Sequence, residues 1–505
     1  MAYDLLVIGG GVNGCAIARD AAGRGLSVLL VEMGDLASAT SSASTKLIHG
    51  GLRYLEQLEF RLVREALEER ETMLAAAPHL VRPLKFVLPH ERGLRPAALI
   101  RLGLFLYDHL ARRTRLEGSH KVALEGTPFG APLKGAYKTG FTYADCWVDD
   151  ARLVVVYALA ARELGAEICV RTRLVEARRL PDRWIARCED EAGAREVEAR
   201  AIANAAGPYV SQTLHDALRI TSKKHARLVK GSHIVTRRLY EGEHAYILQN
   251  PDKRVIFAIP YEQELTLVGT TDVPFDGAPG PVEISAEEVA YLLAAINRCF
   301  AQSVTEADIV WSFSGLRPLF DDGAVQASVT TRDYAFDLDR AGAPALSIFG
   351  GKLTTARRLA EHALDELASA FPQAGPAWTQ GATLPGGDLP DDGFEAFLTQ
   401  FQRERPFLGE RLARRLARAY GTRAEKLLGE ATTMAALGRG FGCGLTQAEL
   451  DYLVREEWVR SGEDALWRRS KLGLMLDERR RAEVNEEIDS LLRRHGPQDA
   501  ARDDL

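Results

Sequence analysis

The chain has 505 residues, of which 46% are hydrophobic and 27% are charged. A chain of this length exceeds what one hydrophobic core usually fills, so we expect two or three domains. The composition excludes collagen-like, disordered and disulfide-scaffold proteins, and a formal net charge of −6 gives no overall attraction to nucleic acid.

Six cysteines are scattered along the chain without a Cys-x-x-Cys pair. This spacing predicts neither a metal site nor a disulfide framework, and we expect reduced, buried thiols in the cytosol. The apolar run at residues 5–8 is too short for a signal peptide, and no window of about 18 apolar residues occurs. The sequence therefore predicts a protein that does not span a membrane.

The chain begins with a strand, a glycine turn, a helix and a second strand. Residues 5–8 and 26–32 are short apolar runs, and a helical segment at 16–22 lies between them. In this βαβ context a glycine turn is typical of dinucleotide binding, whereas an isolated glycine turn often has only a steric role.

The turn matches the pattern G-x-G-x-x-G at Gly9, Gly11 and Gly14. The first glycine permits the tight turn, the second lets backbone N–H groups approach a pyrophosphate, and the third allows close helix packing. Glu32 ends the second strand, where a carboxylate can accept hydrogen bonds from ribose hydroxyls and disfavours a 2′-phosphate. These residues predict a bound dinucleotide.

Two later segments are typical of further parts of the same nucleotide domain. Residues 201–208 form an apolar strand that ends in small residues, and residues 346–355 form a strand, a glycine turn and a helix start. N–H groups at such a turn can face an anionic or electron-rich group. Together the segments predict one sheet assembled from distant parts of the chain.

Short strand-like runs separated by turn residues predict an antiparallel platform between these two segments. The runs are residues 228–235, 245–249, 254–260 and 265–269. A Pro- and Gly-rich stretch at 372–393 then predicts a linker, and the residues after it have the pattern of helices with Arg- and Glu-rich faces.

The segment after the βαβ unit, residues 40–55, has the sequence TSSASTKLIHGGLRYL. Together with five later motifs it closely resembles bacterial aerobic FAD-dependent glycerol-3-phosphate dehydrogenases. The five motifs are residues 145–153, 230–233, 269–272, 314–319 and 350–355. The likeness runs from residue 4 to about residue 480.

This resemblance implies an enzyme that oxidises sn-glycerol 3-phosphate to dihydroxyacetone phosphate on FAD and passes the electrons to membrane quinone. It implies an α/β fold with a glutathione-reductase-like FAD-binding domain, an antiparallel β substrate domain and a C-terminal helical domain, commonly as a homodimer. We therefore expect a peripheral enzyme on the cytoplasmic face of the inner membrane, without a metal.

The resemblance also predicts a discontinuous domain organisation. We expect the FAD-binding domain at 1–75, 145–210 and 311–375, and the substrate-binding domain at 76–144 and 211–310. A linker at 376–393, a helical domain at 394–495 and a tail at 496–505 complete the chain.

The resemblance assigns FAD contacts to the βαβ unit, to residues 40–51 and to the two later strand ends. The predicted cofactor-binding residues are Gly9, Gly11, Asn13, Gly14, Glu32, Thr40, Ser41, Ser42, Ser44, Lys46, Leu47, His49, Gly50, Gly51, Ala206, Gly207, Gly351, Lys352, Leu353 and Thr354.

Oxidation of a secondary alcohol requires a hydride acceptor, a base for the hydroxyl proton and, for this substrate, cations that hold a phosphate. A guanidinium grips phosphate oxygens with two parallel hydrogen bonds. Any one arginine is more often a solvated surface charge, and only the family-like motifs raise these residues to candidates. The predicted substrate-binding residues are Arg53, Tyr54, Thr270, Arg317, Arg332 and Lys352.

The predicted catalytic residues are His233, Arg317, Lys352 and Tyr54. A neutral imidazole is the natural base near pH 7, and both His233 and His49 are flanked by small residues. We prefer His233 as the base and His49 as a flavin contact, with the reverse assignment left open. Tyr54 either donates to a substrate oxygen or only packs.

Residues 92–121 combine apolar side chains with a local charge of +5. This pattern predicts a basic amphipathic helix that lies on an anionic lipid surface, and the alternative is an ordinary buried helix with a charged end. The apolar positions are Leu99, Ile100, Leu102, Leu104, Phe105, Leu106 and Leu110, and the cations are Arg92, Arg95, Arg101, Arg112, Arg113, Arg115 and Lys121.

Three other functions compete with the dehydrogenase. A glycerol-3-phosphate oxidase would share the fold and reduce O2 to peroxide. An amine or hydroxy-acid oxidase would need no phosphate-binding cations, and a structural or sensory flavoprotein would need none of the substrate motifs.

Overall fold

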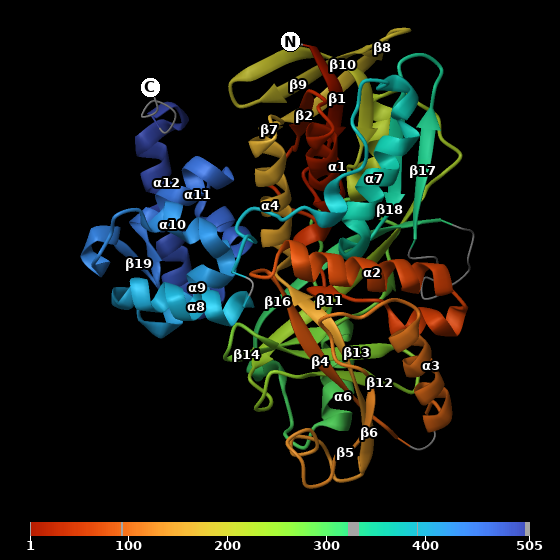
Figure 1. The fold of residues 1–505 in the computed structure, drawn as a ribbon, viewed down its shortest axis with the longest axis vertical. Coiled ribbons are helices and arrows are strands. Elements are labelled where there is room, and N and C mark those ends of the chain that lie inside the picture. The colour runs from red at the N-terminus through yellow and green to blue at the C-terminus, as the bar shows by residue number, and fades with distance from the viewer. Residues whose placement is uncertain (1, 92–93, 322–332, 391, 500–505) are drawn as a thin grey trace.

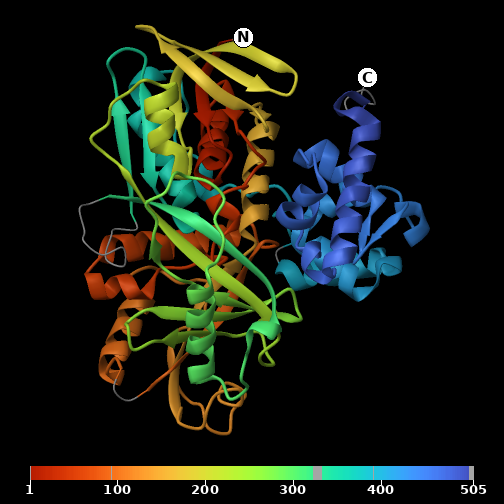
Figure 2. The ribbon, with the colours of Figure 1, turned by 180° about the vertical axis from the view of Figure 1, so that it is seen from behind.

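The computed structural model describes residues 2–91, 94–321, 333–390 and 392–499. Two lobes lie one above the other along the long axis, and a helical domain lies beside them (Figure 1). Seen from behind, each lobe contains segments from distant parts of the chain (Figure 2). The chain therefore passes between the two lobes more than once.

The upper lobe is built on an eight-stranded sheet with the main order β17-β18-β10-β1-β2-β7, and the β8–β9 hairpin pairs with β10. Its central strands are parallel, whereas β17 and β9 are antiparallel to their neighbours. The strands are β1 (Ala2–Ile8), β2 (Val28–Val31), β7 (Glu167–Cys169), β8 (Arg173–Arg179), β9 (Trp184–Asp190), β10 (Gly193–Asn204), β17 (Tyr334–Asp339) and β18 (Ala345–Gly350).

Three neighbouring strands of this sheet end at the same edge. β1, β10 and β18 run parallel, so the glycine turn after β1, the small residues after β10 and the glycine turn after β18 meet there. Ligands bind in such α/β sheets outside the carboxyl ends of the strands. The three segments that the sequence singles out are therefore brought to one place.

Helices cover one face of the upper sheet. α1 (Val12–Gly23) packs against α4 (Asp150–Glu163) and α7 (Ala356–Glu366) in the largest apolar core of the molecule. The opposite face packs against the β8–β9 hairpin around the fully buried Trp184. Burial on both faces explains why residues 5–8 of β1 and all of β2 are continuous apolar runs.

The lower lobe is a ten-stranded sheet with the main order β15-β11-β14-β13-β12-β4-β6-β3, and β16 pairs with β11 and β5 with β6. It is antiparallel except where β12 runs parallel to β4. The strands are β3 (Leu47–Ile48), β4 (Val81–Pro89), β5 (His120–Ala123), β6 (Thr139–Val148), β11 (Ala226–Arg237), β12 (Ala245–Gln249), β13 (Val255–Tyr261), β14 (Leu265–Gly269), β15 (Val273–Pro274) and β16 (Ile309–Phe320).

Three helices complete the two lobes. α6 (Ala286–Cys299) covers one face of the lower sheet and α3 (Ala97–His109) covers the other. α2 (Phe60–Ala76) lies between the lobes, because its first turns belong to the lower core and its last turn to the upper core. α6 begins with a capping box, in which Ser285 and Glu288 satisfy each other's backbone N–H groups.

The apolar side chains of α3 divide between two faces. Ile100, Leu104 and Tyr107 point into the lower core, whereas Leu99, Leu102 and Phe105 are 50%, 54% and 52% exposed. The expected single apolar face is therefore split, and only half of it meets solvent.

The cations around α3 are also partly neutralised. Arg95 pairs with Glu56, and Arg113 lies 3.5 Å from Asp108. Arg92 lies outside the described residues. The local charge of +5 already includes Asp108, so of these two pairs only the one with Glu56, which lies outside residues 92–121, lowers the charge of this surface further.

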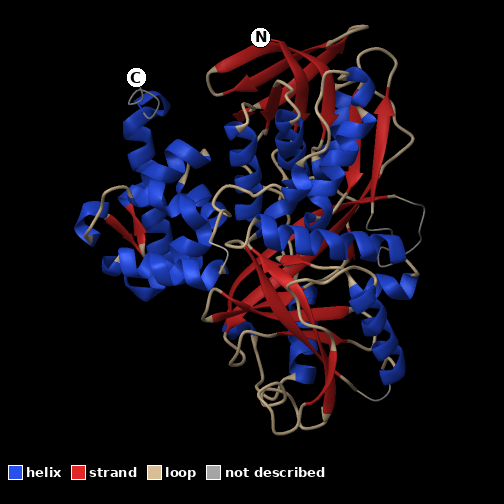
Figure 3. Ribbon diagram, in the orientation of Figure 1, coloured by secondary structure: helices blue, strands red, loops and turns tan. Residues whose placement is uncertain are grey.

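The C-terminal domain has its own apolar core and is almost wholly helical, with one small hairpin (Figure 3). Its helices are α8 (Gly393–Glu404), α9 (Gly409–Tyr420), α10 (Ala424–Leu428), α11 (Gln447–Glu457) and α12 (Glu478–Asp499), and the hairpin is β19 (Gly440–Gly442) with β20 (Leu445–Thr446).

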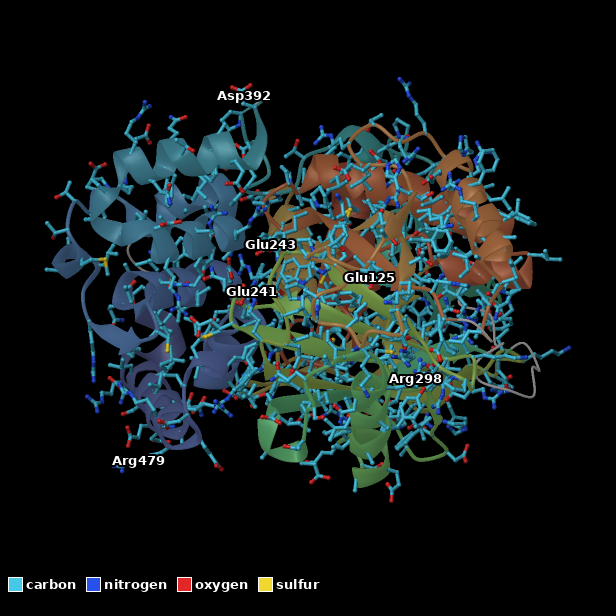
Figure 4. The ribbon with its side chains drawn as sticks, turned by 90° about the horizontal axis from the view of Figure 1, so that it is seen from below. Glu125, Glu241, Glu243, Arg298, Asp392 and Arg479 are labelled. Carbon is cyan, nitrogen blue, oxygen red and sulfur yellow. The ribbon has the colours of Figure 1, made fainter. Side chains whose placement is uncertain are left out.

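Buried ion pairs join this domain to the upper lobe. Asp35 accepts from Arg469 at 2.7 Å, and Arg152 pairs with Glu457, with all four side chains essentially inaccessible. Figure 4, seen from below, also shows Glu241 and Glu243 on the side of the lower lobe that faces the helical domain. Because a buried charge is costly without its partner, these pairs fix the domain in one position.

The expected fold class is confirmed, and the strands lie close to where the sequence predicts them. Several predicted boundaries differ from the observed elements, as β16 and α12 illustrate. β16 begins at Ile309 and belongs to the lower sheet, although we expected residues from 311 onward in the FAD-binding domain. α12 continues to Asp499, past the predicted domain end at 495. The domain boundaries therefore stay a prediction.

Three sequence-based exclusions can be compared with the described residues. None of the described helices is both long and apolar enough to cross a membrane, and within the same residues no cluster of His, Cys, Asp and Glu could hold a metal ion. All six cysteines are free, but Cys443 is exposed, contrary to the expectation of buried thiols.

Candidate functional site

A cleft of about 690 Å³ opens at the carboxyl edge of the upper sheet. It is lined by the turns that follow β1, β10 and β18, and by part of β16 from the lower sheet. Twelve of the predicted cofactor residues line it: Gly9, Gly11, Asn13, Glu32, Thr40, Ser41, Ser44, Ala206, Gly207, Gly351, Lys352 and Leu353. Its position and lining are those of a dinucleotide site.

The glycines of the first turn have the roles that the pattern predicts. A Cβ at Gly14 would lie 1.9 Å from the carbonyl oxygen of Gly9, so only glycine lets α1 approach the strand this closely. A Cβ at Gly11 would meet only Ser41 Oγ, at 3.2 Å. The space beside Gly11 is therefore open to the cleft, and a phosphate can approach its backbone.

The Glu32 carboxylate is held at the end of β2 by two backbone donors. The N–H groups of Gly10 and Gly34 donate to its two oxygens at 2.6 and 2.7 Å. Burial raises the pKa of this carboxyl, and the two N–H groups oppose that rise. The carboxylate has further lone pairs for the predicted ribose contact.

A buried polar atom of Asn13 also fits FAD as the ligand of the cleft. Asn13 donates to the carbonyl of Gly350 at 3.2 Å, and its Oδ1 is buried without a hydrogen-bond partner in the described chain. A buried polar atom without a partner is costly, and a ligand that donates to Asn13 would remove this cost. Asn13 is therefore suited to accept a hydrogen bond from a dinucleotide in this cleft.

Lys46 makes a buried ion pair that the sequence does not indicate. Its ammonium is fully buried, pairs with Asp150 at 2.7 Å and donates to the carbonyl of Ser42 at 3.1 Å. Asp150 also accepts from the N–H and hydroxyl of Ser44 at 3.1 and 2.7 Å. Lys46 therefore fixes the loop from inside, while Ser44 lines the cleft.

Two adjacent acidic residues at the start of α4, Asp149 and Asp150, have different roles in the structure. Asp149 caps α4 by accepting from the N–H of Arg152. Asp150 is the buried partner of Lys46, a role that adjacent acidic residues before a helix do not reveal.

A buried network that the sequence did not predict holds the next part of the loop. The Tyr107 hydroxyl donates to Asp145 at 2.7 Å and accepts from the N–H of Gly50 at 2.8 Å. Arg70 pairs with the same carboxylate at 2.7 Å. This network fixes the backbone beside His49, although Tyr107 lies in α3, far away in sequence.

The predicted anion-binding residue Arg317 lies in β16 between Leu316 and Pro318, which line the cleft, but does not line the cleft itself. One Arg317 nitrogen donates to Asp272 at 2.7 Å and to the carbonyl of Thr271 at 3.0 Å, and the other donates to Thr270 Oγ1 at 2.7 Å. A Cβ at Gly231 would lie 2.1 Å from the guanidinium. Arg317 and Thr270 are thus brought together as predicted, with Asp272 as a further partner that the sequence did not indicate.

His233 is fully buried in the lower sheet. Its Nε2 lies 2.9 Å from Thr45 Oγ1, and its ring stacks on Phe313 at a centroid distance of 4.7 Å. Burial, with the charges of Arg317 and Lys46, holds the pKa of this imidazole well below its usual value. A group so enclosed is a poor match to the predicted role of a base that touches substrate.

His49 is the more open of the two histidines. It is half-buried, and burial lowers the pKa of its imidazole, with Lys352 and Arg70 acting in the same direction and Asp145 opposing them. The imidazole is therefore neutral near pH 7, the form that can accept a proton.

The remaining predicted residues fall into three groups. Lys352 lines the cleft, and its ammonium lies 4.0 Å from the centre of the Tyr54 ring. Arg53 and Tyr54 belong to the turn Leu52–Gln57 and are half-buried. Arg332 lies outside the described residues, so its predicted role stays a prediction.

Eight predicted cofactor residues do not line the cleft. They are Gly14, Ser42, Lys46, Leu47, His49, Gly50, Gly51 and Thr354. The Thr354 hydroxyl accepts from the N–H of His49 at 3.3 Å, which joins the turn after β18 to the loop 40–51. Their predicted contacts therefore stay predictions.

Comparison with known proteins identifies the fold family. The family model described as FAD dependent oxidoreductase matches residues 4–357, and that of the C-terminal domain of alpha-glycerophosphate oxidase matches residues 377–502. The chain is 52% identical over 491 residues to a glycerol-3-phosphate dehydrogenase of Pseudomonas aeruginosa, covering 97% of this chain and 95% of that protein.

Two further proteins are informative. A D-erythritol 1-phosphate dehydrogenase of Brucella abortus is 49% identical over 490 residues, covering 96% of this chain and 98% of that protein. The structure of a glycerol-3-phosphate dehydrogenase from Bacillus halodurans complexed with FAD has a TM-score of 0.75 and 27% identity, covering 97% of this chain and 95% of that one.

The open space beside Gly11 generates a prediction. The Gly11→Val protein should fold and lose most of its FAD, because the side chain fits the ligand-free turn but fills the space that a pyrophosphate needs. The flavin-to-protein absorbance ratio after purification measures this, with circular dichroism as the test of folding. Gly135→Val is the matched control, because a Cβ at this exposed glycine meets nothing within 4 Å. A folded Gly11→Val protein as yellow as the parent would contradict the assignment.

Proposed function

This chain belongs to the family of FAD-dependent oxidoreductases that includes the glycerol-3-phosphate dehydrogenases, and on that premise we propose that it oxidises sn-glycerol 3-phosphate to dihydroxyacetone phosphate. FAD, when bound, supplies the hydride acceptor. The protein's own residues must then hold the phosphate and accept the hydroxyl proton.

One observation carries the proposal. Lys352 lines the cleft that fits FAD, and Arg317 lies in β16 between Leu316 and Pro318, which both line it. Two cations beside the dinucleotide site suit a phosphorylated alcohol, whereas an amine or an uncharged polyol would have no use for them. The name of the Pseudomonas aeruginosa relative agrees with this substrate.

The Brucella abortus relative introduces a second candidate substrate. D-erythritol 1-phosphate also carries a phosphate and secondary hydroxyls, so the same cations would suit it. At 52% and 49% identity the two relatives are almost equally similar to this chain. The substrate test described below therefore has to decide between the two polyol phosphates.

We further propose that the electrons leave to a membrane quinone, with the protein bound peripherally to the cytoplasmic face of the membrane through α3. The exposed Leu99, Leu102 and Phe105 on α3 support this, since apolar side chains on an exposed helix face can insert among lipid head groups. The cations Arg101, Arg112 and Lys121 nearby are exposed and would attract anionic lipid. The expected homodimer stays a prediction, and O2 is the alternative acceptor.

Substrate specificity gives the central test. Purified yellow protein is mixed anaerobically with sn-glycerol 3-phosphate, D-erythritol 1-phosphate, glycerol and an amino-acid panel, and flavin bleaching is followed. Only the phosphorylated alcohols should bleach it, and reoxidation with a quinone analogue should outpace reoxidation with O2. Arg317→Ala should raise KM for the phosphorylated substrate by about 10- to 150-fold, the worth of a charge-assisted contact of about 1.5–3 kcal/mol.

Arg479→Ala is the matched control for Arg317→Ala, because Arg479 is exposed on the C-terminal domain (Figure 4). Comparable bleaching by plain glycerol at the same concentration would rule out the phosphorylated substrate.

The two histidines can be separated by variants. If the half-buried His49 accepts the hydroxyl proton, the flavin of the His49→Ala protein should bleach about 100-fold more slowly, which is the usual size of a general-base effect. The FAD content of this variant should be normal. His233→Ala should then have a smaller effect on the bleaching rate. A base at His233 predicts the reverse, so stopped-flow reduction of the two variants decides between them.

Membrane binding through α3 is tested by flotation with anionic liposomes. The parent should float at low salt, and the double variant Leu102→Ser with Phe105→Ser should float less, because it removes two exposed apolar contacts. Leu164→Ser with Met434→Ser is the control, since these side chains are similarly exposed elsewhere. A parent protein that stays at the bottom of the gradient would refute surface binding and favour the O2-using oxidase.

A further inference from the structure

A buried carboxylate lies behind the anion-binding side of the site. Glu288 belongs to the first turn of α6, is 5% exposed and does not line the cleft. Its Oε1 accepts from the hydroxyls of Ser232 and Thr271 at 2.9 and 2.6 Å. Its Oε2 lies 2.8 Å from Lys230 Nζ and accepts from the N–H of Ser285 at 3.0 Å.

These donors explain how a charge is tolerated there. A buried carboxylate is costly unless it is paired and hydrogen-bonded, and Glu288 has four donors, of which one is a cation. The charge-assisted hydrogen bonds in turn restrict Ser232 and Thr271 to one arrangement.

Thr271 links Glu288 to Arg317 by hydrogen bonds. Its carbonyl accepts from the guanidinium at 3.0 Å, and its neighbours Thr270 and Asp272 supply the other two acceptors. The Thr271 hydroxyl therefore binds Glu288 while its backbone binds Arg317. A single residue, Thr271, therefore links the Glu288 carboxylate to the Arg317 guanidinium.

Ser232 links Glu288 to the cleft by hydrogen bonds. Its hydroxyl lies 2.8 Å from that of Ser314, which lines the cleft, and its N–H donates to Thr271 Oγ1 at 2.9 Å. Since Ser232 gives its own proton to Glu288, Ser314 donates to Ser232. The two routes from Glu288 thus end at Arg317 and at the cleft wall beside it.

We propose that Glu288 is a positioning residue for phosphate binding, because it fixes the segment Thr270–Asp272 that orients the Arg317 guanidinium. This inference rests on the proposed function, since it requires Arg317 to contact the substrate phosphate. It predicts that loss of the Glu288 charge weakens substrate binding more than turnover.

The alternative is a purely structural role, in which Glu288 only stabilises α6 as the third residue of its capping box. The two roles can be separated within the same turn. Ser285→Ala removes the side-chain half of the capping box but leaves the Glu288 contacts with Ser232 and Thr271 available.

The key variant is Glu288→Gln. Its amide keeps one acceptor oxygen and replaces the other by an N–H2 group, so either the Ser232 and Thr271 hydroxyls or Lys230 and Ser285 lose their acceptor. We expect KM for sn-glycerol 3-phosphate to rise about tenfold while kcat changes less than about threefold, with FAD content unchanged. Thr271→Val removes one of the same contacts and should raise KM in the same direction if Glu288→Gln does not fold.

Two control variants should leave KM at the parent value. Ser285→Ala should lower only the melting temperature, and Glu287→Gln changes the adjacent, exposed carboxylate of the same helix. A Ser285→Ala protein with the raised KM of Glu288→Gln would show that helix stability is the cause and would overturn the positioning role.

Arg317→Ala, measured in parallel, separates two kinds of failure. One outcome is that Arg317→Ala raises KM while the folded Glu288→Gln and Thr271→Val proteins keep the parent KM. In that case the positioning role is wrong and the proposed phosphate contact stands. If Arg317→Ala also leaves KM unchanged, the phosphate contact itself is wrong and the inference falls with it.

Discussion

The ion pair between Lys46 and Asp150 is the interaction on which the site depends. It holds a loop that touches three separate parts of the chain: Ser41 Oγ accepts from the N–H of Val12 at the start of α1, Thr40 donates to the carbonyl of Leu316 in β16, and Thr45 bonds His233 in β11. The loop thus connects the dinucleotide turn of one sheet to two strands of the other. With both charges buried, removal of either partner would leave the other uncompensated.

Sequence reasoning located the nucleotide end of the site well, because that chemistry is local. A glycine turn between a strand and a helix has a fixed spacing, and small residues after parallel strands predict where a ligand approaches. Hence Gly9, Gly11 and Gly351 line the cleft as expected. The motif-based resemblance supplied Arg317 and Lys352, which spacing alone would not distinguish from other cations.

The buried polar partners of the site could not be predicted in the same way. Asp145, Asp272 and Glu288 each act through a contact that the fold creates. Tyr107 looks like one more large residue in a helix, and only the packing of α3 brings its hydroxyl to Gly50. The Lys46–Asp150 pair was missed for the same reason, since a lysine in a cofactor loop gives no sign of a carboxylate partner about a hundred residues later.

The strand order of the upper sheet also constrains how the protein is made. β10 pairs with β1 on one side and with β18 on the other, and β18 ends at Gly350. Residues 193–199 of β10 pair with the preceding β9, whereas residues 202–204 pair with β18 and stay unpaired on that edge until more than a hundred further residues have left the ribosome. Such an edge can pair with another chain, and sheets closed by distant segments form slowly. The cofactor cleft therefore gains its third wall only after β18 has been made.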